Sequence, residues 1–235
     1  MKKNYFSSDT KVVLCIADYP WHFSFFGVIS MALFNIPLLY NRSVKFYKLM
    51  GCGKNGSFDI QPDLNKWALM VFFESSNNSS PKGDTSEPDI PGKFIRFWWR
   101  LFHAKTHSFL LEPFTGHGSW DGFSYKQTGE KEPDSTEKVA VLTRASIRFS
   151  KAISFWRAVP DASKQLASQS GLKFTIGIGE IPFFKQATFS VWDSIESVKN
   201  YAYRQPAHKT IIQRTRKEKW YTEEMFIRFR VLKEF

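Results

Sequence analysis

The chain has 235 residues, of which 43% are apolar and 17% aromatic, and a formal net charge of +11. Its apolar content is normal for a globular protein, and its two cysteines, Cys15 and Cys52, are too few for a disulfide framework. Both lie in strand-like apolar runs, which predicts buried thiols in a reducing compartment. The excess of positive charge favours an anionic partner: nucleic acid, a membrane surface or an acidic ligand.

The first half of the chain, residues 1–126, is predicted to follow the order β-α-β-β-α-β. Pro20 is typical of a helix start, and Pro37 is expected to lie beyond the helix end. The predicted elements are a strand at 11–19, a helix at 20–34, strands at 45–53 and 66–74, a polar loop at 75–88, a helix at 91–105 and a strand at 108–114.

Residues 22–40 form the one segment apolar enough to suggest a membrane span. The segment contains His22, Asn35 and Pro37, and it falls where the predicted order requires a core helix. We therefore expect a buried helix there and not a transmembrane one. The first residues carry two lysines without an apolar stretch or a cleavage site, so no signal peptide is predicted. We expect a cytoplasmic protein with peripheral membrane association.

The second half, residues 139–235, has the same layout after a polar linker at 127–138. Gly177-Ile178-Gly179 takes the place in this half that Gly51-Cys52-Gly53 takes in the first. The predicted elements are a strand at 139–149, a helix at 150–168 that Pro160 divides, strands at 172–179 and 185–192, a helix at 193–203 capped by Asp193 or Ser194, a helix from Pro206 to 220 and a strand at 225–232.

This layout predicts an α+β fold made of tandem ferredoxin-like repeats, of the dimeric α+β barrel type, within one chain. The two sheets would join into a barrel-like body with the helices outside and a cavity within. Two independent ferredoxin-like domains on a linker are the alternative, and the sequence leaves both open. The high aromatic content fits either a thick core or a cavity for a large, flat, apolar ligand.

Histidines give the candidate chemical sites. His208 shares a helical face with Ile211, Ile212 and Thr215, so it is either a core histidine or a ligand to haem iron. His117 lies in a glycine-rich phrase from Gly116 to Gly122, which is either an ordinary tight loop or a close backbone approach to another group. Two further histidines, His103 and His107, have the i, i+4 spacing of a metal pair, but no HExxH pattern surrounds them.

Several enzyme classes lack their motifs here. The chain has no Walker motif, no G-x-S-x-G, no CxxC and no complete dinucleotide fingerprint, and neither cysteine has an adjacent base. The basic run at 204–219 is either a solvated helix face or a surface for porphyrin carboxylates or anionic lipid. No nucleic-acid motif accompanies it, so nucleic acid is not the expected partner.

Several phrases resemble the spheroidene monooxygenase family of carotenoid biosynthesis, and the similarity is dense over residues 139–232 and sparse before residue 110. The first-half loop resembles that family's His-Gly-x-Trp-x-Gly phrase. The similar phrases are His117-Gly118-Ser119-Trp120-x-Gly122, Val141-Leu142-Thr143-Arg144-Ala145, Phe155-Trp156-Arg157-Ala158-Val159-Pro160, Gly177-Ile178-Gly179-Glu180, Gln186-Ala187-Thr188-Phe189-Ser190-Val191-Trp192-Asp193, Ala202-Tyr203-Arg204, His208, Arg214-Thr215-Arg216 and Trp220-Tyr221-x-Glu223-Glu224.

This resemblance implies a haem-dependent monooxygenase, related to dimeric α+β barrel proteins, that oxidises a methylene carbon of a long polyene to a hydroxyl and then a ketone. His208 becomes the candidate iron ligand. From residue type alone, we expect Arg204 and Arg214 to hold haem propionates. The same reasoning places Trp156, Phe189 and Trp192 along the walls of the haem site or the substrate channel.

Other function classes remain open at this point. A binder of haem or of an apolar ligand without catalysis, and a cofactor-free monooxygenase of the same fold, both fit the pattern. The expected partners of the oxygenase are a hydrophobic small molecule, an electron-donor protein and, through peripheral contact, a membrane. The sequence does not fix the substrate or the oligomeric state.

Overall fold

The computed structural model describes residues 4–6, 9–54, 61–74, 89–125, 131–204, 214–215 and 217–235. The elements in chain order are β1 (Asn4–Phe6), β2 (Thr10–Asp18), the short 3-10 helix η1 (Trp21–Phe23), α1 (Ser24–Leu33), α2 (Asn35–Tyr40), β3 (Val44–Gly53), β4 (Pro62–Glu74), α3 (Lys93–Leu101), β5 (Lys105–Trp120), β6 (Phe123–Tyr125), β7 (Val139–Ile147), η3 (Phe149–Lys151), α4 (Ala152–Ala167), β8 (Leu172–Ile181), β9 (Lys185–Trp192), α5 (Ile195–Arg204) and β10 (Tyr221–Glu234).

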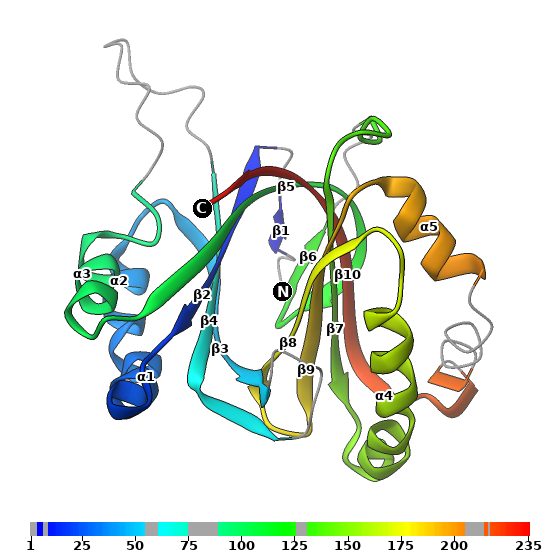
Figure 1. Cartoon of the computed structure of the whole chain (residues 1–235), viewed down its shortest axis with the longest axis horizontal. Helices are drawn as coiled ribbons and strands as arrows, with labels where there is room; N and C mark the ends of the chain where they lie inside the picture. The colour runs from blue at the N-terminus through cyan, green and yellow to red at the C-terminus, as the bar shows by residue number, and fades with distance from the viewer. Residues whose placement is uncertain are drawn as a thin grey trace.

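Eight strands close into a barrel. Their order is β5-β10-β7-β9-β8-β3-β4-β2, and β2 pairs back onto β5 to complete the ring (Figure 1). The short strand β6 forms a hairpin with the end of β5, and β1 lies parallel to β6. Closure removes the exposed sheet edges that would otherwise pair with another chain.

Strand alternation divides the core into an inside and an outside. In β2, Val12, Leu14 and Ile16 belong to the cluster inside the barrel, whereas Val13 and Cys15 belong to the cluster between the sheet and the first-half helices. Every second residue of a strand faces the same side, and both faces here are covered, so the strand is apolar from Val12 to Ala17. The inside cluster is packed with aromatic and aliphatic side chains from both halves.

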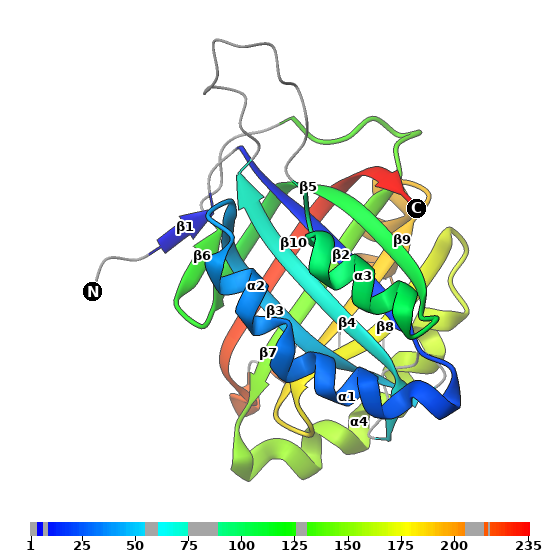
Figure 2. The same cartoon turned by 90° about the vertical axis from the view of Figure 1, so that its left-hand side faces the viewer.

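The helices lie outside the barrel in two groups. α1, α2 and α3 cover the strands of the first half, and α4 and α5 cover those of the second (Figures 1 and 2). Ile95 and Trp99 of α3 are buried against the first group's core, and Ile195 and Val198 of α5 against a separate one. The barrel therefore has one inner core and distinct outer cores under each helix group.

The two halves have the same strand order, which is β3-β4-β2-β5 in the first and β8-β9-β7-β10 in the second. They meet at two seams. β5 and β10 form a long antiparallel seam, whereas the described register between β3 and β8 aligns only Gly51 with Gly179 and Cys52 with Ile178. The glycine phrases that take equivalent places in the two halves thus face each other. The predicted division at residues 127–138 stays a prediction.

The expected helix boundaries need two corrections. The first helix, α1, ends at Leu33, before Pro37 as expected, but a second helix, α2, was not expected; it begins at Asn35 and contains this proline in its first turn. An N–H is not needed in a first turn, so proline is tolerated there. Pro160 does not divide the later helix, since α4 runs from Ala152 to Ala167 without a break.

The strands around the predicted His117 loop are longer than expected. Residues 116–120 belong to β5, and the turn comes only at Asp121 and Gly122. The helix predicted to reach residue 105 ends at Leu101, because β5 begins at Lys105. The polar loop predicted at 75–88 lies outside the described residues.

Other expectations agree with the structure. Strand β9 has the predicted bounds, and the Ser194 hydroxyl accepts a hydrogen bond from the Ser197 backbone N–H at 3.2 Å, as expected of a helix N-cap. Cys15 and Cys52 are free, buried thiols. Burial raises the pKa of Cys15 to about 11 and that of Cys52 to about 12, so both are protonated near neutral pH.

The apolar segment Trp21–Tyr40 is buried on one side only. Among the described residues it is the one helical stretch long and apolar enough to cross a membrane by length and composition, with a mean hydropathy of 1.7. Phe34 and Leu38 are buried against the sheet. However, only 22% of the most apolar 18-residue stretch of this segment is buried inside the protein. The expectation of a buried helix is therefore wrong for its outer face.

Candidate functional site

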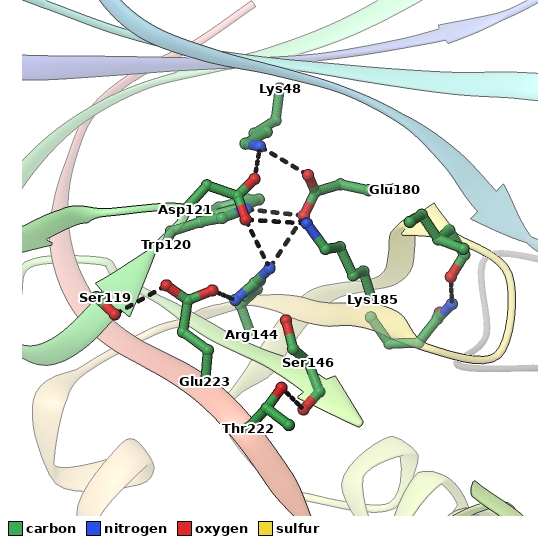
Figure 3. A network of polar contacts seen from close by, with 12 residues as sticks. Lys48, Ser119, Trp120, Asp121, Arg144, Ser146, Glu180, Lys185, Thr222 and Glu223 are labelled. Carbon is green, nitrogen blue, oxygen red and sulfur yellow. Dashed lines mark hydrogen bonds and ion pairs between the residues drawn. The ribbon is translucent and has the colours of Figure 1, made fainter. Parts of the chain in front are cut away.

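Six charged side chains fill one end of the barrel interior (Figure 3). Arg144 of β7 lies at the centre and is 1% exposed. It faces inward because it shares a strand face with Leu142 of the inner core. Its guanidinium donates a hydrogen bond to Glu223 of β10, and its Nη2 lies 3.4 Å from the Glu180 carboxylate of β8.

Two lysines complete the network. The Lys48 Nζ of β3 lies 2.7 Å from Glu180 Oε2 and contacts Asp121, while the Lys185 Nζ lies 2.9 Å from Asp121 Oδ1. Arg144 Nη2 is 3.6 Å from the same Asp121 oxygen. Three cations thus face three carboxylates, and the group is close to neutral as a whole.

A tight turn places Asp121 in the network. Asp121 and Gly122 both have positive φ angles, 47° and 88°, which join β5 to β6 in the space of two residues. The preceding Trp120 is fully buried, and its indole Nε1 donates a hydrogen bond to Glu180 Oε1 at 2.8 Å. The His117 phrase therefore supplies the barrel with both a core residue and a carboxylate.

The glycines of this phrase permit a close backbone approach. A Cβ on Gly118 would lie 2.0 Å from the Glu224 carbonyl oxygen, and one on Gly116 would lie 2.6 Å from that of Phe226. Both carbonyls belong to β10, so the group that these glycines approach is the neighbouring strand. His117 itself stacks on Phe226, with ring centroids 5.4 Å apart.

The network favours the ionised form of two of its carboxylates, those of Asp121 and Glu223. Burial raises the pKa of Asp121, but hydrogen bonds from Lys48 and Lys185 outweigh this effect and lower the pKa to about 2. At Glu223, burial likewise opposes hydrogen bonds from Ser119 and Arg144, and the pKa is lowered. Such groups are poor proton donors near neutral pH, so the arrangement fits closure of the barrel end better than acid–base catalysis.

The surface of the described structure has two larger hollows. A hollow of about 550 Å³ between α1 and β3 is lined by apolar residues such as Val28 and Met31 of α1 and by Lys48 and Glu180 of the network. A groove of about 500 Å³ on the second half is almost wholly apolar. We call it the α4 groove; its lining residues are Phe149, Ala152, Ile153, Trp156, Arg157, Phe183 and Phe184.

The six residues proposed from the sequence do not share one cavity. Trp156 lines the α4 groove, and its indole donates a hydrogen bond to the Phe183 carbonyl at 3.0 Å. Phe189 is buried inside the barrel, whereas Trp192, three residues further along β9, is buried outside it beneath α5. His208 and the side chain of Arg204 lie outside the described residues.

An aromatic cluster connects Arg214 to Trp156. Its guanidinium is 5.4 Å from the Trp220 ring, which contacts Phe155, the neighbour of Trp156. Its Nε also lies 3.2 Å from Glu218 Oε1. The structure thus gathers Trp156 and Arg214 around one aromatic cluster, with Arg214 paired to Glu218 through its Nε.

The residue types that line the α4 groove suit a haem. Its walls are aromatic and aliphatic, and Arg157 at its side is the type of residue that meets a propionate. None of the described histidines lines it. His107 Nε2 lies 2.9 Å from Glu234 Oε1, and the His103 ring stacks on Phe23 with centroids 5.9 Å apart. The described residues hold no cluster of three or more His, Cys, Asp or Glu suited to a metal.

The charged network was not predicted from the sequence. Arg144, Glu180 and Glu223 each stand inside a phrase already noted for its family resemblance, but no chemistry was assigned to them. The available signal was an arginine in the middle of the apolar strand β7, since a buried cation requires buried carboxylates. Which strands supply those carboxylates follows only from the closure of the barrel.

The fold defines a mixed α+β protein with a closed eight-stranded barrel. A crystal structure of aldoxime dehydratase resembles it with a TM-score of 0.58 at 10% identity, covering 97% of this chain and 84% of that one. At this identity the likeness concerns the fold alone.

Sequence relatives are more specific. Spheroidene monooxygenase of Rhodobacter capsulatus is 36% identical over 219 residues, which is 92% of this chain and 85% of that protein. The corresponding proteins of Rubrivivax gelatinosus and Cereibacter sphaeroides are 33% and 30% identical and are covered over 71% and 57% of their lengths. No protein-family model matches. The chain belongs to the spheroidene monooxygenase family, as its phrases predicted.

Proposed function

We propose that this protein is a monooxygenase that inserts oxygen into a carotenoid-like or other hydrophobic substrate. The observation that carries the proposal is the 36% identity to a spheroidene monooxygenase along 92% of the chain. An apolar substrate also agrees with the α4 groove, whose lining is almost free of polar groups.

The proposed cofactor is haem, held by His208 as the iron ligand. Bound haem would supply the activation of oxygen. Trp156 and Phe183 would form an apolar wall beside it, and Arg157, Arg204 and Arg214 are the candidates for its propionates. The role of these residues is to bind and orient the haem and to exclude water from the reaction site.

The two halves are, in this proposal, tandem ferredoxin-like repeats in the arrangement of a dimeric α+β barrel. Their identical strand order and the pairing of Gly51 with Gly179 support this interpretation. The proposed location is the cytoplasm, where the expected electron-donor protein would be met.

The test is an absorption spectrum of protein made with added haem precursor, with His208→Ala and Trp156→Ala beside the unchanged chain. A Soret band that His208→Ala abolishes or shifts supports haem ligation by this residue. Oxygen consumption with a polyene that disappears in the same variant supports the monooxygenase.

Other outcomes select a different class. No Soret band even after haemin titration, together with oxygen consumption that survives His208→Ala, identifies a cofactor-free oxygenase. A Soret band without turnover of any polyene identifies a haem-binding protein. Lys199→Ala is the matched control, because Lys199 lies on α5 in an exposed ion pair with Glu132.

A further inference from the structure

The outer face of the first-half helices is apolar and open. Segment Trp21–Tyr40 contains no Asp, Glu, Lys or Arg in 20 residues. Trp21, Leu39 and Tyr40 are 79%, 71% and 84% exposed, and Phe25, Val28 and Ile36 are also exposed. Scattered surface apolar residues are normal, but six exposed apolar side chains along one segment without a charged residue form an apolar strip, which marks an interaction surface.

Helix α3 extends this strip sideways. Figure 2 shows α3 beside α1 and α2 on one flank of the barrel, and the rings of Phe26 and Phe102 stack there with centroids 3.9 Å apart. Phe94, Phe97 and Leu101 of α3 are exposed. We call the exposed apolar residues of segment Trp21–Tyr40 and of α3 together the α1–α3 face.

The segment lies along the protein surface and does not project from it. Gly27 lets α1 approach the sheet, since a Cβ there would lie 2.5 Å from the Trp67 indole Nε1. The Tyr47 hydroxyl donates a hydrogen bond of 2.9 Å to the Asn35 side-chain oxygen at the start of α2. One side of the segment is thus packed against the barrel. A partner can therefore contact only its exposed side, with α1 and α2 lying parallel to the partner's surface.

The charges of the face are positive. Lys93, Arg96 and Arg100 alternate along α3 with its exposed apolar side chains, and α3 contains no acidic residue. Arg96 is paired with Asp89, while no ion pair to Lys93 or Arg100 is found in the described part of the chain. An apolar face rimmed by cations complements an anionic lipid surface.

We propose that the α1–α3 face docks on the surface of a lipid bilayer, with α1 and α2 lying in the plane of the interface. Trp21 and Tyr40, at the two ends of the segment, are the residue types that favour the membrane–water boundary. A second copy of the chain would be a less suitable occupant, because the cations of α3 would then meet the same face of the other copy, and neither α3 nor segment Trp21–Tyr40 contains an acidic residue to pair with them.

The experiment is sedimentation of the full chain with vesicles of phosphatidylcholine alone and of phosphatidylcholine with phosphatidylglycerol. The unchanged protein is expected to bind the anionic vesicles more tightly. The triple variant Trp21→Ser/Leu39→Ser/Phe97→Ser is expected to bind both at least about tenfold more weakly, since it removes three inserted apolar side chains. Lys93→Gln/Arg100→Gln is expected to lose the preference for anionic lipid.

The matched control is Phe149→Ser/Ile153→Ser, which removes two apolar side chains of 84% and 71% exposure from the other flank of the barrel. It is expected to bind vesicles as the unchanged protein does. Equal loss in both variants, or no vesicle binding by the unchanged protein, overturns the proposal. A dimer in lipid-free solution that the triple variant dissociates, without vesicle binding, assigns the face to a second copy. The readout needs neither haem nor turnover, so it is independent of the proposed oxygenase activity.

Discussion

Replacing Arg144 by methionine tests the interpretation of the charged network as the closure of the barrel end. The arginine is 1% exposed and lies between three carboxylates, of Asp121, Glu180 and Glu223. Methionine has a similar reach and no charge, so Arg144→Met changes the network from three cations against three anions to two against three. The uncompensated negative charge remains in a largely buried place.

The expected cost follows from the burial of the partners. Removing one member of a buried ion pair costs about 3–5 kcal/mol. The three carboxylate side chains are 35%, 14% and 22% exposed, and the water that reaches them places the expectation near the lower limit, at about 3 kcal/mol. For a chain of this length, this corresponds to a fall in Tm of about 6–12 °C.

The assay is urea and thermal unfolding of four proteins: the unchanged chain, Arg144→Met, Glu223→Gln and the double variant. Because the double variant restores the balance of charge, it is expected to be more stable than the sum of the single effects predicts, by at least about 1 kcal/mol. Lys199→Met is the control for an exposed pair and is expected to cost less than about 1 kcal/mol.

Two results would refute this reasoning. Arg144→Met within about 1 kcal/mol of the unchanged protein would mean that the guanidinium is not needed to neutralise the buried carboxylates. Strict additivity in the double variant would mean that Arg144 and Glu223 do not act on each other, despite their contact across β7 and β10.

Three further predictions concern single sites. Gly118→Ala is expected to cost more than about 3 kcal/mol in urea unfolding, whereas Gly122→Ala, which has a similar φ but no atom within 4 Å of a new Cβ, should cost only about 1–2 kcal/mol for its backbone conformation; equal losses would contradict the steric argument. The pKa of Asp121 is lowered to about 2 from 3.8, so its contribution to stability is present above pH 3.8 and is lost as the pH falls toward 2. The Tm difference between the unchanged chain and Asp121→Asn should therefore shrink over that window, and a constant difference would argue against it. Cys15 and Cys52 are expected to resist iodoacetamide at pH 8 in the native protein and to react after denaturation, because burial raises the pKa of both thiols; fast native labelling, read by mass spectrometry, would show that the barrel opens.

Most of the secondary structure could be predicted from local patterns. Strand β9 and the N-cap Ser194 follow from alternation and from a side-chain oxygen placed three residues before an amide, and both are properties of neighbouring residues. The helix α2 was missed because Pro37 was taken to end a helix. Proline is tolerated in the first turn of a helix, so the effect of Pro37 depends on where α2 begins. The sequence does not reveal that start, because no capping side chain marks it.

The candidate site was harder to predict, for a topological reason. Lys48, Arg144 and Glu180 are far apart in the sequence, and only the closure of the barrel brings their side chains to one end. Phe189 and Trp192 were grouped by residue type, but a spacing of three residues places them on opposite faces of a strand. Short-range spacing cannot decide which cavity a strand residue faces.

The unequal seams between the halves bear on how the barrel opens and closes. The β5–β10 seam is aligned along most of both strands, whereas β3 and β8 meet at Gly51 and Gly179 and one further pair. A short stretch of strand pairing between residues distant in the chain contributes little free energy until most of the barrel has formed, because the entropy of closing the long loop opposes it. Backbone amides at the β3–β8 seam should therefore be the first of the barrel to exchange with solvent deuterium, with the Lys48–Glu180 ion pair as the side-chain link that limits this local opening.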